Sequence, residues 1–405
     1  MHRPLRRIPL AATVVALLAG WSTSATAAPP PQSGPVIELR QRYEHVDDAA
    51  SARNADAHTL RLRLRLGYHW AFAPGWQAHV DGEHVQPLSG EHYNSTANGR
   101  VQYPVVADPK STELNQAFIA WSNETSGVTV GRQRIQLDNQ RFIGNSGWRQ
   151  NEQTFDAVAL KHSLAPGGPT FQYIHLDRVL RVFGEDHPDP LQARWKLNGH
   201  LLHLDQPLPL GQLATYGYLI KNRDVATLST QTWGLRWTGQ KELAQATPGW
   251  ALEYAHQSDW GNNPLSVSAS YRLLEGSLKW RGVTFRAGQE VLGGDGRYGF
   301  STPYASLHPF NGWADRFGGV SPRDGLDDRY FGASGGIGAS AFTWAAAWHD
   351  FRADHGGASY GTELDLSLGY AFGTHWNALL KYADYRADGF STDVRKAWAS
   401  VEYRF

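Results

Sequence analysis

Apolar and polar residues alternate with a period of two along much of the chain. Residues 60–70 read LRLRLRLGYHW, so a strand would carry the leucines on one face and Arg61, Arg63 and Arg65 on the other. On a helix these arginines would be spread around the axis among the leucines, with no polar face to receive them. The same alternation returns at residues 363–372, and it predicts β-strands as the main structural element.

Segments of this kind predict eighteen strands. They lie near residues 35–45, 58–72, 76–85, 113–122, 128–137, 152–162, 169–180, 197–206, 212–222, 228–239, 249–258, 264–280, 283–292, 326–337, 341–352, 360–372, 375–386 and 393–405. The eighth strand is the least regular, because leucines occur at both parities around His200 and His203, and the fourth has apolar residues on both faces. Sixteen strands therefore remain an alternative count. Either number is even, which puts both ends of the chain on one side of a barrel.

The connections between these strands alternate between short and long. Tight links at 73–75, 281–282 and 373–374 contrast with long polar segments at 86–112, 138–151, 181–196 and 294–325. Outer-membrane barrels have short periplasmic turns and long extracellular loops. The pattern favours the same arrangement here, with the N-terminus on the periplasmic side.

Aromatic residues decide between a membrane barrel and a large soluble sandwich or propeller. The apolar faces end in aromatics beside the short turns, as at Tyr68, Trp70 and Trp76, where a membrane interface would need a girdle. A soluble sheet would instead have polar outward faces. The sequence therefore predicts an all-β fold, a single closed antiparallel transmembrane β-barrel.

The N-terminal segment has the features of an export signal. Three arginines precede an apolar stretch of 13 residues, Ile8 to Gly20, and a small-residue triplet ends at Ala27. We expect cleavage after Ala27, a short linker at 28–34 and a barrel over 35–405. The stretch is shorter than the ~20 residues of a spanning helix, so strands are expected to cross the membrane. The location expected is the bacterial outer membrane, with lipid and lipopolysaccharide around the barrel and the assembly machinery recognising the C-terminal Phe405.

Composition excludes several classes of function. The chain has no cysteine, which rules out disulfides, thiol nucleophiles and thiolate metal sites. Removal of residues 1–27 takes away three arginines and no carboxylate, which leaves 35 basic and 38 acidic residues and argues against a nucleic-acid partner.

Charged positions opposite the apolar faces are the candidates for the lumen. The pore-lining candidates on strands are Arg40, Arg42, Arg61, Arg63, Arg65, Arg236, Lys279, Arg286 and Glu290. Inward positions of one strand lie ~7 Å apart, so three arginines in a row repel one another unless carboxylates or a bound anion screen them. Two interpretations remain open: a wall ladder that neutralises itself, or a stripe that attracts anions.

Several loop motifs resemble the alginate-export family of outer-membrane porins. They are GRQ at 131–133, DNQRFIG at 138–144, WRQ at 148–150, EVLGGDG at 290–296 and LHPFNGWADRF at 307–317. The resemblance implies an 18-stranded, monomeric, passive channel, since the namesake passes an anionic uronate polysaccharide outward through an arginine-rich constriction. It also implies that Arg132, Arg141 and Arg149 point at the pore or its mouth. Strict parity from Val130 would place Arg132 outward, unless a bulge at Gly131 reverses it.

Other functions remain as alternatives. A general or sugar-specific uptake porin shares every fold argument, and an outer-membrane barrel enzyme is a more distant possibility, because no G-x-S-x-G or H-E-x-x-H motif occurs. No cofactor is expected. Asp324, Asp327 and Asp328 are weak candidates for a calcium site, and a solvated acidic loop is the ordinary interpretation.

Overall fold

The computed structural model describes residues 33–50 and 56–405, and these form one antiparallel sheet of 18 strands. The strands are β1 (Gly34–Asp48), β2 (Ala57–Ala73), β3 (Trp76–Pro87), β4 (Ser111–Ser122), β5 (Ser126–Gln133), β6 (Thr154–Ser163), β7 (Thr170–Leu180), β8 (Arg194–Leu208), β9 (Gly211–Asn222), β10 (Thr230–Gln240), β11 (Ala246–Asp259), β12 (Ser268–Trp280), β13 (Val283–Leu292), β14 (Leu326–Gly336), β15 (Phe342–Arg352), β16 (Ser359–Phe372), β17 (Trp376–Ala387) and β18 (Val394–Arg404). The expected leader and most of the expected linker lie outside the described residues.

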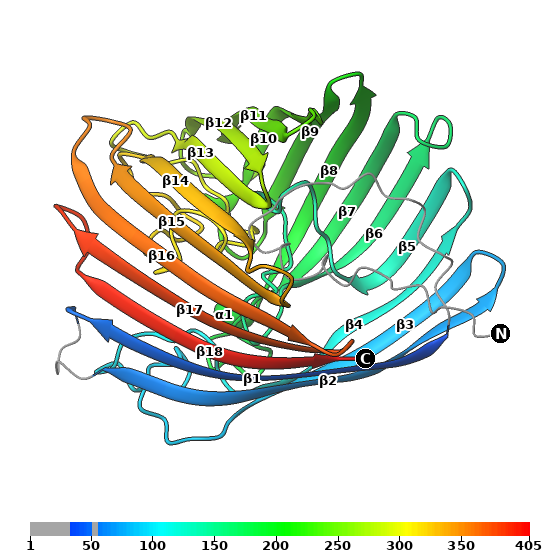
Figure 1. Cartoon of the computed structure of the whole chain (residues 1–405). Helices are drawn as coiled ribbons and strands as arrows, with labels where there is room; N and C mark the ends of the chain where they lie inside the picture. The colour runs from blue at the N-terminus through cyan, green and yellow to red at the C-terminus, as the bar shows by residue number, and fades with distance from the viewer. Residues whose placement is uncertain (1–32, 51–55) are drawn as a thin grey trace, which may run out of the picture.

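The sheet closes on itself into a barrel (Figure 1). Each strand pairs with its neighbours in the sequence, and β1 also pairs with β18, from Glu38 opposite Arg404 to Asp48 opposite Val394. Closure leaves no unpaired strand edge, as a sheet in lipid requires. The prediction of 18 strands is confirmed, and the alternative of 16 is excluded.

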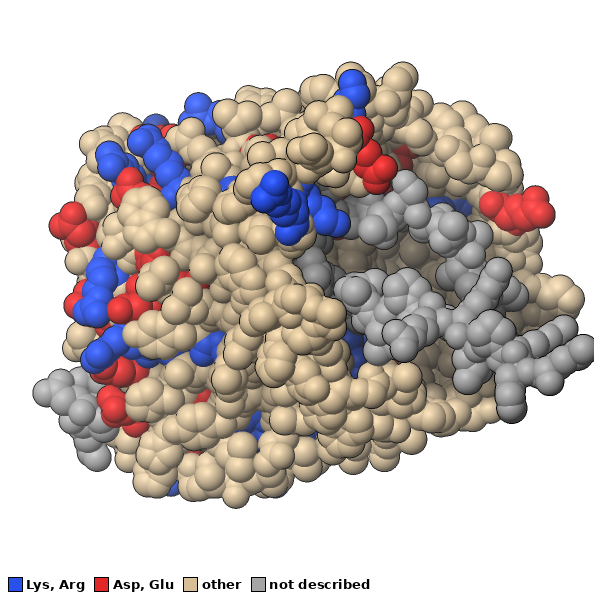
Figure 2. Space-filling view, viewed as in Figure 1, with Lys and Arg blue, Asp and Glu red and all other residues tan. Residues whose placement is uncertain are grey.

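Burial follows the parity that the sequence predicts. On β2, Arg61 and Arg63 are fully buried, whereas Leu66 on the opposite face is 52% exposed. Aromatic side chains gather at the short turns, where Phe72 lies 6.4 Å from Trp76 between ring centroids. On the face in Figure 2, charged side chains gather at the left, over the loop ends of β15 to β18, and the middle of that face carries few charges. This distribution is that of an apolar band bounded by a charged rim.

The two strands that look irregular in the sequence have different explanations. In β4, Gln116 pairs with Asp81 and Leu114 with Gly82, so Asn115 is an extra residue in a β-bulge. The bulge reverses the parity and therefore exposes both Leu114 and Ile119. β8 pairs with β9 without a shift, whereas its pairing with β7 shifts by one residue between Leu176 and Arg178.

Helix is almost absent from the part of the chain that the structure describes. The structure contains α1 (Pro190–Ala193) and η2 (Ala226–Leu228), each about one turn long. No helix in residues 33–50 and 56–405 is long and apolar enough to span a membrane.

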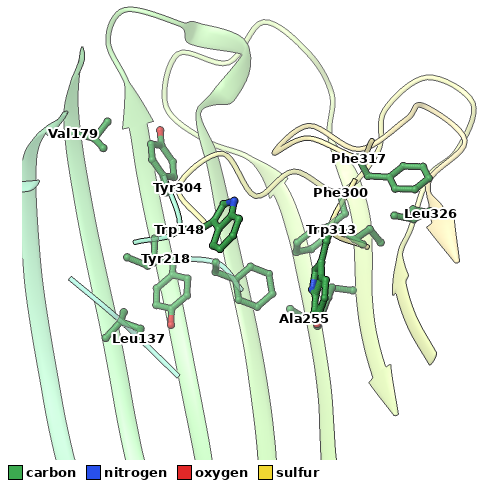
Figure 3. Close-up of a cluster of buried hydrophobic side chains, with 14 of the residues drawn as sticks. Leu137, Trp148, Val179, Tyr218, Ala255, Phe300, Tyr304, Trp313, Phe317 and Leu326 are labelled. Atoms are coloured by element: carbon green, nitrogen blue, oxygen red, sulfur yellow. The ribbon is translucent and has the colours of Figure 1, made fainter. Parts of the chain in front are cut away.

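Two long loops fold into the barrel and hold each other. We name residues 134–153 the first inner loop and residues 293–325 the second inner loop. The Gly144 N–H donates to the Tyr304 carbonyl at 2.9 Å, and the Ser306 N–H donates to the Gln140 carbonyl at 3.0 Å. The main hydrophobic cluster lies between these loops and the strands, with Trp148, Phe300, Tyr304 and Trp313 among its members (Figure 3).

The backbone of the inner loops is locally strained. Among the described residues, eight that are not glycine have positive φ, and five of them lie in these loops: Asp138, Gln140, Ser146, Asn311 and Asp315. Such a conformation is costly for a residue with a Cβ and persists only where surrounding contacts fix it. The side-chain contacts of these loops are therefore central to the shape of the lumen.

Candidate functional site

A large cavity runs through the barrel beside the two inner loops. Its volume is about 2740 Å³. Its lining includes Gly282 and Gly373 in short turns, Arg181 and Phe183 at the opposite end, and residues of both inner loops. The cavity therefore reaches from the periplasmic turns to the extracellular loops, and this is the shape that a channel needs.

The arginine stripe lies in one wall of the barrel, on β1 and β2. In the strand register, Arg40 lies opposite Arg63 and Arg42 lies opposite Arg61, which places like charges side by side. Directly opposed like charges destabilise a sheet. Their stable coexistence requires carboxylates within reach.

Those carboxylates come from several elements. Glu402 on β18 contacts Arg63 at 2.8 Å and Arg40 at 3.0 Å. Arg61 contacts Glu44 at 2.9 Å and Asp108 at 3.2 Å. Of the two sequence-based interpretations, the geometry is that of the self-neutralised ladder.

Arg65 completes the ladder toward the first inner loop. It contacts Glu38 at 3.0 Å and Glu152 at 2.8 Å. Burial by itself would raise the pKa of the Glu152 carboxyl, but Arg65 and Arg134 lower it to about 2. Glu152 is therefore ionised across the physiological range and joins the loop to the wall.

The first inner loop covers this ladder. Arg42 donates to the Trp148 carbonyl at 2.7 Å, and its guanidinium lies 3.9 Å from the Trp148 ring centroid. Arg40 donates to the Gly147 carbonyl at 3.1 Å. Arg40 and Arg42 remain at the edge of the cavity, but Arg61, Arg63 and Arg65 do not line it. The expectation that these three form the pore surface is therefore wrong, because the loop and its carboxylates occupy the space in front of them.

Arg141 is also buried, and it joins the two inner loops. It donates to Glu290 on β13 at 2.7 Å and to the Asn311 side chain in the second inner loop at 2.8 Å. Asn311 in turn donates to Glu290 and Asp328. Glu290 lines the cavity and Arg141 does not. Arg141 therefore acts on the channel by fixing the loops, which corrects its assignment as a pore-facing residue.

A second group of contacts, around Asp315, joins the two inner loops to each other and to β17. Arg149 contacts Asp315 at 3.1 Å, and His308 Nδ1 lies 2.9 Å from the same carboxylate. Lys381 on β17 lies 2.6 Å from His308 Nε2 and 3.6 Å from the Trp313 ring centroid. A neutral His308 satisfies this arrangement, since Nδ1–H donates to Asp315 and Nε2 accepts from Lys381.

The charges of this cluster are fixed by its surroundings. Burial, together with Lys381, lowers the pKa of His308 to about 3. Burial would raise the pKa of Asp315, but His308, Lys396 and Arg149 hold it well below the usual range. At neutral pH the cluster therefore combines an anionic Asp315 with a neutral imidazole.

The cavity surface itself carries more positive than negative side chains. Among the described residues, ten lysines and arginines line it: Arg40, Arg42, Arg149, Lys161, Arg181, Arg236, Lys279, Arg286, Lys381 and Arg404. Seven carboxylates line it: Asp138, Asp205, Glu242, Glu275, Glu290, Asp328 and Glu402. Arg149, Arg236, Lys279, Arg286 and Glu290 thus lie where the sequence places them.

Sequence reasoning gives no role to several residues that shape the cavity. The motif at 307–317 stands out in the sequence, but nothing there assigns His308, Trp313 or Asp315 a partner. Arg181 is missed as well, and it lies 3.9 Å above the Trp195 ring. The only sign of the Asp315 cluster in the sequence is that His308 and Asp315 occur in the same aromatic motif, at 307–317.

Arg132 requires a correction. Its neighbours Val130 on β5 and Leu114 on β4 are exposed on the outer face. The two strands pair without a register shift at Gly131. Arg132 contacts Asp156 at 2.9 Å and donates to the Leu114 carbonyl at 2.8 Å. It does not line the cavity. Strict parity holds, and the expected reversal at Gly131 is absent.

The expected calcium candidates do not converge. Asp327 contacts Arg329 at 2.8 Å, whereas Asp328 lies 2.9 Å from His349. Neighbouring strand residues point to opposite faces, so these two carboxylates cannot share one ion. In the described chain, Asp324, Asp327 and Asp328 form no metal-binding group.

Comparisons with known proteins agree with this architecture. A model of the alginate export family matches residues 36–176. OccAB4 of Acinetobacter baumannii is 14% identical, with 93% of this chain and 98% of that chain covered and a TM-score of 0.72. OccK9 (OpdG) of Pseudomonas aeruginosa is 13% identical, with 92% and 98% covered and a TM-score of 0.74.

One of the similar structures includes a small aromatic carboxylate. OpdK of Pseudomonas aeruginosa with vanillate is 14% identical, with 92% of this chain and 98% of that chain covered and a TM-score of 0.70. Comparison with curated protein sequences gives no significant match. At these identities the structures establish the fold alone, which is that of a closed antiparallel β-barrel.

Proposed function

Since this chain is an outer-membrane β-barrel channel that matches the alginate-export family over residues 36–176, we propose that it passes hydrophilic anionic solutes passively. The observation that carries the proposal is the cavity surface, where ten lysines and arginines face seven carboxylates among the described residues. A water-filled bore with excess positive charge concentrates anions and repels cations. Arg61, Arg63 and Arg65 do not enter this argument, because they lie behind the first inner loop and do not line the cavity.

Selectivity in a lipid bilayer tests the proposal. The reversal potential in a KCl gradient should show that chloride is more permeant than potassium. Replacement of both Lys161 and Lys279 by Gln leaves eight cationic against seven anionic residues on the described cavity surface. The permeability ratio should therefore move close to one.

Arg395→Gln is the matched control, because Arg395 pairs with Asp47 on the outer side of β18 and does not line the cavity. Its loss should leave the reversal potential unchanged. Cation selectivity of the wild-type channel contradicts the proposal, and so does a double variant that is as selective as the wild type.

The favoured solute is an anionic uronate polysaccharide, on the basis of the family match. Guanidinium groups offer paired donors to carboxylates, and contacts that exchange readily permit passage. Oligouronates added on one side should reduce the current, whereas neutral oligosaccharides of equal length should not. Equal block by both would favour a general or sugar-specific porin.

A second candidate is the uptake of small carboxylates. Aromatic Trp148, Phe310 and Trp313 line the cavity together with its cations, which suits a small aromatic anion. The similarity to the structure of OpdK with vanillate supports this candidate. Block by vanillate at concentrations where oligouronates have no effect would favour it over the polymer.

The proposal requires no catalytic step. A serine-reactive probe should leave the refolded protein unlabelled, and labelling at one residue would point to an enzyme instead.

We further propose that the barrel functions as a monomer among lipid and lipopolysaccharide. Outward ion pairs near the loop ends, such as Arg352 with Asp350 at 2.8 Å, suit a charged headgroup layer. Phe405 is exposed, as recognition by the assembly machinery requires.

A further inference from the structure

A histidine and two carboxylates meet where the first inner loop leaves the wall. Asp138 belongs to this loop, and His203 and Asp205 lie on β8. One ligand atom from each lies within 4.8 Å of the others, and in residues 33–50 and 56–405 this is the only such group of three. The cluster is separate from the arginine ladder and from the contacts of Asp315.

The imidazole of His203 is only partly satisfied by hydrogen bonds to these neighbours. Its side chain is 3% exposed, and Nε2 lies 3.0 Å from an Asp138 carboxylate oxygen. Nδ1 lies 3.4 Å from Asp205 Oδ2 and makes no hydrogen bond within the described structure. A buried polar atom without a partner costs free energy and calls for a ligand or a water molecule.

A small cavity adjoins the two carboxylates of the cluster, although His203 itself does not line it. Its volume is about 20 Å³, and Asp138, Asn139, Asp205 and Gln212 are among its lining residues. A cavity of roughly 10–15 Å³ holds one water-sized sphere, so a single ion or water molecule fits. Polar groups on several sides make the space suitable for an ion.

The surroundings also orient the carboxylates. Gln212 donates to Asp205 Oδ1 at 2.7 Å, which leaves Oδ2 directed toward His203. Outer hydrogen bonds of this kind commonly hold metal ligands in place. Arg236 lines the small cavity, but its guanidinium is paired with the buried Glu253, which offsets its repulsion of a cation.

We propose that Asp138, His203 and Asp205 bind one divalent first-row metal ion, with Zn²⁺ the best fit. One imidazole and two carboxylates match the ligand preferences of Zn²⁺, whereas Ca²⁺ and Mg²⁺ prefer oxygen ligands alone. Two carboxylates also balance the charge of a divalent ion. Small shifts of the side chains bring the three ligand atoms to the ~2.0–2.2 Å that Zn²⁺ requires.

The position gives the ion a structural effect. Asp138 has a φ of 50° at the beginning of the first inner loop, so the loop reaches β8 through a strained residue. A bound ion joins this residue to the wall and thereby fixes the loop that covers the arginine ladder. This inference goes beyond the proposed anion selectivity and does not depend on it.

Calorimetric titration of the refolded, metal-free barrel with ZnCl₂ tests the site. We expect a one-to-one binding step that a large excess of CaCl₂ does not suppress. His203→Gln and, separately, Asp138→Asn should weaken this step at least tenfold. His200→Gln is the matched control, since His200 lies on the same strand but contacts Tyr173 on the outer face, and it should bind Zn²⁺ as the wild type does.

Heat-modifiable migration on a denaturing gel verifies that each barrel is folded. If His203→Gln does not fold, Asp138→Asn decides, because Asp138 lies in a loop. Equal binding by Asp138→Asn and the wild type would overturn the proposal, and so would suppression by CaCl₂ or the absence of a step. The anion selectivity is measured without zinc, so failure of either proposal leaves the other intact.

Discussion

The arginine ladder supplies a prediction in which two neighbouring arginines have different effects on stability. Arg61 is the direct partner of both Glu44 and Asp108, and all three side chains are buried. Arg63 contacts Glu38 and Glu402, but these carboxylates keep Arg65 and Arg40 as other partners. Replacement by Gln therefore leaves two poorly compensated buried charges in the first case and none in the second.

The magnitudes follow from this difference. Loss of one partner from a buried ion pair destabilises a protein by about 3–5 kcal/mol. Loss of hydrogen bonds to groups that keep another partner costs about 1–3 kcal/mol. Arg61→Gln should therefore be less stable than Arg63→Gln by roughly 2 kcal/mol, a factor of about 30 in the unfolding equilibrium.

The pH dependence provides a second test. In the wild type, burial would raise the pKa of Asp108, but Arg61, Arg149 and Arg42 lower it, so its ionised form stabilises the fold above the unfolded pKa of about 3.8. This stabilisation disappears as the pH falls through the lowered pKa. Without Arg61, the pKa of Asp108 should rise, because only Arg149, Arg42 and the Gln150 N–H still oppose the effect of burial. Acid then protonates the carboxyl, so the deficit of Arg61→Gln is largest at neutral pH.

Urea unfolding of the refolded barrels, followed by tryptophan fluorescence, measures both effects. The gap between the two variants should be present at pH 7.5 and smaller at pH 5. Equal stability at pH 7.5 would show that Asp108 and Glu44 find other partners. A gap that widens toward pH 5 would contradict the assignment of the penalty to ionised carboxylates.

Four further outcomes follow from the same contacts. Leu66→Arg places a charge on the lipid face and should cost up to about 2–4 kcal/mol near the midplane in urea unfolding. Asp315→Asn removes the negative charge and one of the two oxygens that accept from Arg149 and His308, so single-channel recordings should show more current noise than the wild type. Gly131→Ala should refold in lower yield than Gly34→Ala, because Gly131 has a φ of 124° and its added Cβ would lie 2.3 Å from the Ala117 carbonyl oxygen. The folded pKa of His308, about 3, lies below its unfolded value of about 6.5. The free energy of unfolding of the wild type should therefore decrease as the pH is lowered from about 6.5 to about 3, and that of His308→Gln should decrease less.

The strands could be predicted because lipid imposes a strict pattern on them. Outward positions that face hydrocarbon must be apolar and every backbone group must be paired, so a period of two recurs in strands from β1 to β18. The exceptions have local causes. The bulge at Asn115 depends on one extra residue in the pairing of β3 with β4, and no feature of a single strand reports it.

Whether a strand side chain points inward or outward could also be predicted from the alternation. Parity alone placed Arg132 outward and Arg236 inward, and the structure agrees with parity in both cases. The motif resemblance argued for the opposite direction at Arg132. A resemblance in loop sequence gave no information about strand register, whereas the alternation around Val130 did.

The lumen could not be predicted, because it depends on where loops come to rest. Arg61, Arg63 and Arg65 look in the sequence like a surface for anions, yet the carboxylates that neutralise them come from β1, β3, β18 and two loops. Asp108 and Glu152 are distant in sequence from these arginines: Glu152 reaches Arg65 from the first inner loop, and Asp108 reaches Arg61 from the loop between β3 and β4.

A row of arginines on an inward strand face thus has two uses that the sequence does not distinguish. If the row faces water, it attracts anions, and if a loop lies over it, it anchors the loop through carboxylates and carbonyl groups. The difference is set by the number of carboxylates within reach. Here Glu402 and Asp108 supply them, so the selectivity of the channel must arise from cations that the loop leaves uncovered, among them Lys161 and Lys279.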